Sequence, residues 1–79
     1  MAPVRVRLTF PESLVTQPII ARMVRSFDVL PNIRRASVED DVGWMVCEIG
    51  GEPAAVAAAL AWLAGEGVQV DPIEDVVEG

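Results

Sequence analysis

The chain has 79 residues, which is enough for a single domain spanning residues 1–79 and too few for a second core. Its composition, 52% hydrophobic and 23% charged, favours a packed globule over a disordered chain. A net charge of −6 opposes contact with phosphate backbones and anionic membranes, so we expect no nucleic-acid partner. No stretch resembles a signal peptide or a membrane span, and we therefore expect no membrane insertion and a cytoplasmic location.

A strand followed by a helix is predicted in the first third of the chain. Apolar and polar residues alternate from position 4 to position 10, which indicates a strand with one buried face. Residues 11–13 break this pattern. Pro18 suits the first turn of a helix, and Asp28 and Pro31 close the helical region. The apolar stripe of this helix comprises Ile19, Ile20, Met23, Val24 and Phe27.

A hairpin is predicted next. The second strand is expected over residues 33–39, and the third over residues 44–49, ending at the Gly50-Gly51 pair. Between the two strands, acidic residues and Gly43 are typical of a tight hairpin turn. Strict alternation assigns Arg34, Ala36 and Val38 to one face of the second strand, the face on which Asn32 also lies.

The last third predicts a helix and a short strand. Pro53 opens the helix, which is rich in alanine, and Gly65 and Gly67 end it. A strand over residues 68–73 completes a core of about residues 4–73, before an acidic C-terminal tail of residues 74–79. The order β-α-β-β-α-β predicts an α+β, ferredoxin-like sandwich: a four-stranded antiparallel sheet with two helices on one face. The uncovered face, if apolar, would be a dimer surface.

Catalytic chemistry is not expected. The chain lacks histidine, so Ser-His and Cys-His nucleophiles are excluded, and no carboxylate spacing resembles a metal loop. We therefore expect no enzyme activity, no catalytic residue, no metal and no cofactor. Cys47 lies in the third strand and is interpreted as a small buried hydrophobic residue; a sulfur-handling thiol is the alternative.

Several segments together resemble one known family. They include Pro18-Ile19-Ile20, Asn32-Ile33-Arg34-Arg35-Ala36, Gly43-Trp44-Met45-Val46-Cys47-Glu48-Ile49, and Gly67-Val68-Gln69-Val70. Their order and spacing resemble the NIL domain over roughly residues 4–73. The resemblance implies an ACT-like ferredoxin fold of the kind found at the C-terminus of methionine-importer ATPases, where such domains pair and bind methionine, and fused to some ferredoxins. No Walker A motif is present and there is one cysteine, so we expect action in trans or as a free sensor.

The resemblance also implies a ligand site. Asn32 and Val38 match the two family positions that contact the amino acid, whereas Arg34 stands where the family carries leucine or isoleucine. Burying an unpaired guanidinium costs several kcal/mol, so we expect Arg34 at an edge or interface. It either reaches solvent or an acidic residue of a partner chain, the interpretation we favour, or it binds the carboxylate of a ligand.

The function predicted on these grounds is a regulatory module that binds methionine or a related sulfur amino acid at a homodimer interface. Its sequence support is Asn32 on a strand beside an open sheet face. The alternative is a non-catalytic accessory protein that docks onto a sulfur-metabolism or transporter partner through that face.

Overall fold

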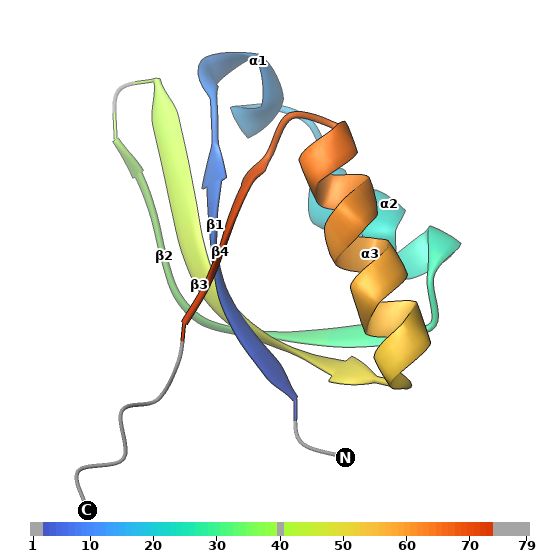
Figure 1. Cartoon of the computed structure of the whole chain (residues 1–79). Helices are drawn as coiled ribbons and strands as arrows, with labels where there is room; N and C mark the ends of the chain where they lie inside the picture. Colours follow the sequence, from blue (N-terminus) through green and yellow to red (C-terminus); the bar gives the residue numbers. More distant parts are fainter. Residues whose placement is uncertain (1–2, 40, 74–79) are drawn as a thin grey trace, which may run out of the picture.

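The computed structural model describes residues 3–39 and 41–73, which form one sheet with helices packed on one side of it (Figure 1). The strands are β1 (Val4–Phe10), β2 (Val29–Glu39), β3 (Val42–Gly51) and β4 (Gln69–Pro72). The helices are α1 (Glu12–Val15), α2 (Ile19–Ser26) and α3 (Pro53–Gly65). The strand order is β2-β3-β1-β4 and all neighbours are antiparallel, so the predicted ferredoxin-like α+β fold is confirmed.

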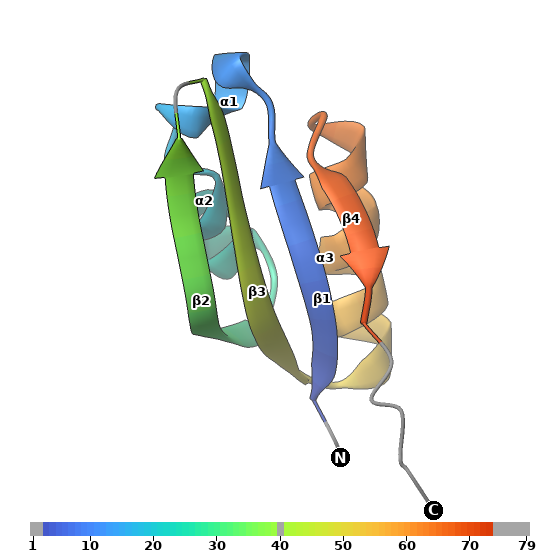
Figure 2. The ribbon, with the colours of Figure 1, turned by 90° about the vertical axis from the view of Figure 1, so that its left-hand side faces the viewer.

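The core lies between the sheet and the two long helices. Figure 2 shows the strands side by side, with α2 and α3 behind them. Alternate residues of β1 face the helices, as the period of two predicted, and Leu8 is fully buried at the centre. Each large apolar side chain removed from water contributes about 1.5–3 kcal/mol before the entropy of ordering is subtracted. The buried apolar residues are Val6, Leu8, Phe10, Leu14, Ile19, Met23, Val29, Cys47, Ile49, Val56, Ala59, Leu63 and Val68.

The segment between β1 and α2 contains a short helix that the sequence did not predict. Helix α1 has four residues, and the carbonyl of Pro11 accepts hydrogen bonds from the amides of Leu14 and Val15. Its single turn buries Leu14 against the core. Helix α2 begins directly after Pro18 as expected, although Val24 of the predicted apolar stripe is 41% exposed.

The hairpin of β2 and β3 is longer than predicted. Strand β2 begins at Val29 and runs through Pro31, so the assignment of Pro31 to the end of the helical region is wrong. A proline is tolerated here because β2 is an edge strand, where one row of backbone amides needs no partner within the sheet. Strand β3 extends two residues beyond the predicted range at each end.

A β-bulge interrupts the pairing of β2 with β3. Ile33 pairs with Cys47 and Arg35 pairs with Val46, so Arg34 is the extra residue. Because side chains alternate along a strand, one inserted residue exchanges the faces of everything after it. Asn32, opposite Glu48, therefore lies on the open face, whereas Val38, opposite Gly43, lies on the face that the helices cover.

The last two elements follow the sequence closely. Helix α3 begins at Pro53 and ends at Gly65, as predicted, and Gly67 (φ +103°) turns the chain into β4. Strand β4 is shorter than predicted and pairs with β1 at the second edge of the sheet. The predicted tail of residues 74–79 lies outside the described residues. No helix in the described part of the chain is long and apolar enough to cross a membrane.

Candidate functional site

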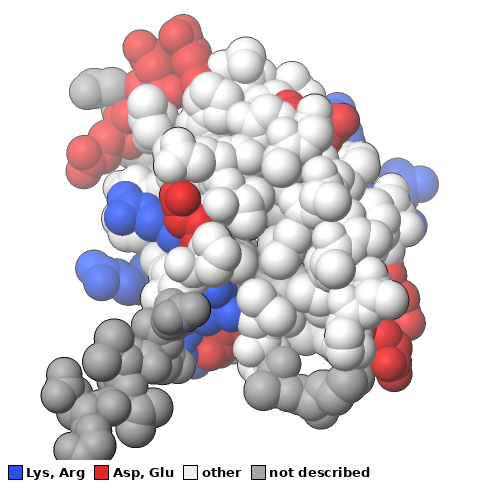
Figure 3. Space-filling view, viewed as in Figure 1, with Lys and Arg blue, Asp and Glu red and all other residues white. Residues whose placement is uncertain are grey.

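The open face of the sheet is charged at its centre, contrary to the expectation of an apolar face. Cross-strand pairing places Arg5 opposite Glu48, and Arg7 and Arg35 on either side of Val46. Basic side chains gather accordingly at the left margin of Figure 3, on the side of the sheet away from the helices. This surface is suited to polar contacts rather than to extensive apolar packing.

Glu48 holds two of these arginines. Its Oε2 accepts a hydrogen bond of 2.9 Å from Arg5 Nη2, and its Oε1 accepts one of 3.1 Å from Arg34 Nη1. The hydrogen bond from Arg5 is the main reason that the pKa of Glu48 lies below its ordinary value, with smaller contributions from the charges of both arginines and from the hydrogen bond of Arg34. Glu48 is therefore ionised at neutral pH and fixes both guanidinium groups.

The Arg34 side chain reaches both solvent and an acidic residue, and its binding of a ligand carboxylate stays a prediction. It lies on the edge strand, as expected, and is 56% exposed. Its acidic partner is Glu48 of the same chain rather than a residue of a second chain.

A cation–π contact occupies the neighbouring part of the open face. The guanidinium carbon of Arg7 lies 4.9 Å from the centroid of the Trp44 ring. Such contacts contribute about 0.5–1 kcal/mol at exposed positions. Trp62 lies on the helical side, where its ring centroid is 6.0 Å from that of Phe27. The two tryptophans therefore lie on opposite sides of the sheet.

Only part of the predicted ligand site is brought together. Asn32 and Arg34 both lie beside Glu48, on the open face. Val38 lies on the other face, so the prediction that alternation places all three side chains on one face is wrong, and the bulge at Arg34 is the cause. Asn32 and Val38 are six residues apart, or about 20 Å along an extended strand.

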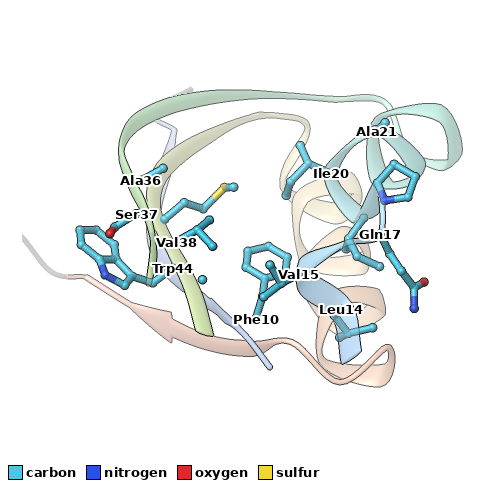
Figure 4. A pocket seen from close by; sticks show the side chains of 14 residues that line it. Phe10, Leu14, Val15, Gln17, Ile20, Ala21, Ala36, Ser37, Val38 and Trp44 are labelled. Carbon is cyan, nitrogen blue, oxygen red and sulfur yellow. The ribbon is translucent and has the colours of Figure 1, made fainter. Parts of the chain in front are cut away.

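Val38 instead lines an apolar cavity of about 210 Å³ that the sequence did not predict. Figure 4 shows Val38 on one wall, with Phe10, Val15 and Ile20 facing it from the other elements. The cavity lies between the outer half of the β2–β3 hairpin and the segments of α1 and α2 (Figure 4). The one sequence signal for it is the small residue Gly43, which leaves room between Val15 and Val38.

The remaining candidate, Cys47, is enclosed in the core. The thiol is fully buried, and burial raises its pKa to about 11. A buried neutral thiol is a poor nucleophile. Within residues 3–39 and 41–73, no cluster of three or more cysteine, aspartate and glutamate side chains could hold a metal ion.

The fold and these surfaces define a small ferredoxin-like domain with one apolar cavity and one charged sheet face in its described part. A model of the NIL domain matches residues 4–72, and the chain belongs to that family. It is 35% identical over 74 residues to the methionine import ATP-binding protein MetN 1 of Paraburkholderia xenovorans, covering 89% of this chain and 22% of that protein. The chain thus spans about a fifth of the length of this relative.

A solved structure has the same fold. The crystal structure of the C-terminal domain of an ABC transporter ATP-binding protein from Enterococcus faecalis superposes with a TM-score of 0.83 at 23% identity. The match covers 95% of this chain and 88% of that chain. At this identity the likeness establishes the shared architecture.

Proposed function

We propose that the chain is a regulatory binding module for methionine or a related sulfur amino acid, and that it carries out no chemistry of its own. The observation that carries the proposal is the apolar cavity beside β2, with Val38 in its wall. The relative from Paraburkholderia xenovorans is a methionine import protein, which directs the choice of ligand.

The cavity has the size and polarity for one apolar side chain. At about 210 Å³ it falls below the roughly 300–1,000 Å³ of sites for drug-sized molecules. Met45 contributes flexible apolar surface, Ile20 contributes a stiffer apolar wall, and none of the lining residues is charged. An unbranched thioether side chain fits such walls, while the ammonium and carboxylate groups of the ligand would remain at the solvated mouth.

A homodimer paired through β2 would complete the site. The edge strand exposes Leu30 (77%) on the open face and Ile33 (51%) and Val38 (68%) on the other face, apolar surface that a second copy could cover. One small amino acid cannot span the roughly 20 Å between Asn32 and Val38 of one chain.

Antiparallel pairing of two β2 strands would bring Val38 of each subunit to the dimer interface. A pairing centred between Arg34 and Arg35 keeps each face of the joined sheet continuous, because it sets residues of the same face opposite each other. Pro31 then lies opposite Val38 of the partner subunit. Asn32 then lies near that valine along the joined strands but on the open face, whereas the valine lies on the face that the helices cover. The ligand would therefore occupy the cavity beside Val38 without contacting Asn32.

Calorimetry with methionine, cysteine, homocysteine and S-adenosylmethionine tests the proposal. We expect methionine to bind, and Val38→Phe, which fills the cavity, to weaken binding by at least about tenfold, or ~1.4 kcal/mol. Val42→Phe is the matched control, because Val42 is also an exposed hairpin valine but lies outside the cavity lining. Light scattering should show a dimer that methionine strengthens. No heat from any of the four compounds at millimolar concentration would exclude this function.

A second candidate function is docking onto a transport or sulfur-metabolism protein through the open sheet face. The concentration of arginine on a face that the described helices leave uncovered favours it. A complex that survives Asn32→Ala but is lost on Val46→Glu would support docking without a small ligand.

A further inference from the structure

Four of the six arginines of this acidic chain lie on one surface. The chain carries 12 acidic residues against 6 arginines, yet Arg5, Arg7, Arg34 and Arg35 converge on the open sheet face. The described acidic residues across the middle of this face are Glu48 and Asp71, which lie opposite Arg5 and Arg7. The centre of the face is therefore positive while the chain as a whole is negative.

Three of the arginines surround a shallow depression of about 250 Å³. Arg5, Arg34 and Arg35 form its rim, and half-buried Val46 is its floor. Glu48 holds Arg5 and Arg34 in place by a hydrogen bond to each, and the exposed Arg34 guanidinium has further donors that can face solvent. Arg35 makes no salt bridge with any residue that the structure describes. A positive rim around an apolar floor fits a carboxylate attached to an apolar neighbour.

We propose that this face binds an extended, carboxylate-rich segment of a partner protein. The inference deepens the docking function proposed above, rests on it, and gives the partner its chemistry. Charge complementarity carries the argument: the arginines attract carboxylates, and Val46 and the Trp44–Arg7 pair supply contact surface for the apolar residues between them.

The spacing of the arginines favours an extended segment. Arg5 and Arg7 are two residues apart on one strand, or about 6.6 Å, the distance between alternate side chains of another extended chain. A single small anion would gain little at so exposed a place, because water and salt screen each contact. A segment that makes several such contacts at once gains from all of them.

Nucleic acid is a poorer occupant of the same face. A phosphate backbone running along the hairpin would meet Glu39 and Asp41 at its tip, and Asp71 at the other edge of the sheet. A protein segment can place its carboxylates only where the arginines are. The net charge of −6 adds long-range repulsion for any polyanion.

The test is an NMR titration of the isotope-labelled chain. The indole N–H signals of its two tryptophans are monitored as each probe is added. The probes are a short peptide in which glutamate alternates with valine, the same peptide with glutamine in place of glutamate, and a single-stranded oligothymidylate. We expect the glutamate peptide to shift the signal of Trp44, on the open face, and to leave that of Trp62 unchanged. Raising the salt concentration should weaken the binding.

Two variants locate the contact. Arg34→Gln with Arg35→Gln should weaken binding of the glutamate peptide by about tenfold, since both guanidiniums on the β2 side of the depression are lost. Arg22→Gln with Arg25→Gln removes the same charge from α2 and should change binding less than about twofold.

Each other outcome overturns the inference. Equal shifts with the glutamine peptide would leave docking in place but refute the acidic partner. Tighter binding of the oligothymidylate would assign the face to nucleic acid. Equal losses of peptide affinity in the two double variants would show that only the net charge of the chain matters, and not the position of the arginines. If no probe moves the Trp44 signal, both the acidic partner and docking through this face are refuted, while the methionine proposal stands or falls separately.

Discussion

Arg34 and Glu48 are joined across the hairpin by a hydrogen bond of 3.1 Å, at the point where the backbone of β2 is irregular. Arg34 is the bulged residue of β2, between positions that pair with Cys47 and Val46. Alternation from Asn32 points its side chain to the open face, where Glu48 also accepts a hydrogen bond from Arg5. One carboxylate thus connects the edge strand to the two central strands.

This network should respond to acid. The folded-state pKa of Glu48 lies below its ordinary value of 4.5, so its contribution to stability is complete above pH 4.5 and is lost as the pH falls through the lowered value. We expect Glu48→Gln to lower the midpoint of thermal unfolding at pH 7, and the difference from the unaltered chain to shrink towards pH 2. A constant difference over that range would contradict the ionic role of Glu48.

Two leucines should respond very differently to truncation. Leu8 is fully buried at the centre of the sheet, so Leu8→Ala should cost about 2–5 kcal/mol of unfolding free energy. Leu30 is 77% exposed on the edge strand of the single chain, and Leu30→Ala should change the stability of the monomer by less than about 0.5 kcal/mol. Urea unfolding measures both. Similar losses would show that the edge of the sheet is covered in solution, as the proposed dimer requires.

Two glycines give a second matched pair. A Cβ at Gly51 (φ +147°) would lie 2.9 Å from the carbonyl oxygen of Asp28, so Gly51→Ala should destabilise the fold by about 1–3 kcal/mol. A Cβ at Gly43 would meet Val15 and Val38 at 3.5 Å, an ordinary contact. Gly43→Ala should therefore leave stability within about 1 kcal/mol while narrowing the apolar cavity. Chemical unfolding combined with methionine calorimetry separates the two effects.

Cys47 should be unreactive in the folded chain. Burial raises the pKa of its thiol to about 11, so at pH 8 a thiol reagent should modify it only after denaturant is added. Because the folded-state pKa exceeds the ordinary 9.0, the neutral thiol favours folding below pH 9, and this contribution is lost as the pH rises towards 11. Cys47→Ala should lack this alkaline loss. Rapid modification of Cys47 by the reagent under native conditions would contradict this prediction and support a chemical role for the thiol.

The overall fold could be predicted because its signals are local. Alternation from Val4 to Phe10 depends only on which side chains meet water, and Pro53 and Gly65 mark the ends of α3 through their own backbone preferences. The four-residue helix α1 could not be predicted, since one turn carries no periodicity. Nor could the early start of β2, because Pro31 is acceptable only on an edge strand, and sequence order alone does not show which strand lies at an edge.

The site was less predictable because it depends on tertiary structure. Asn32 and Val38 were placed on one face by counting residues, and counting assumes an unbroken register. The cavity beside Val38 arises where α1 and α2 meet the hairpin, a contact between segments far apart in the sequence. The arginine-rimmed depression could not be predicted without the cross-strand register, which sets Arg5 opposite Glu48 and Arg35 opposite Val46 on β3.

The bulge at Arg34 also limits how the roles of β2 residues can be transferred between members of this family by sequence alignment. An alignment matches letters in columns, and a bulge leaves the columns intact while rotating every later side chain of the strand by half a turn. A residue after position 34 can therefore stand in the same column as its counterpart in a relative that lacks the bulge and yet point to the opposite side of the sheet. Functional assignments on β2 should be transferred by cross-strand partner rather than by position in the alignment.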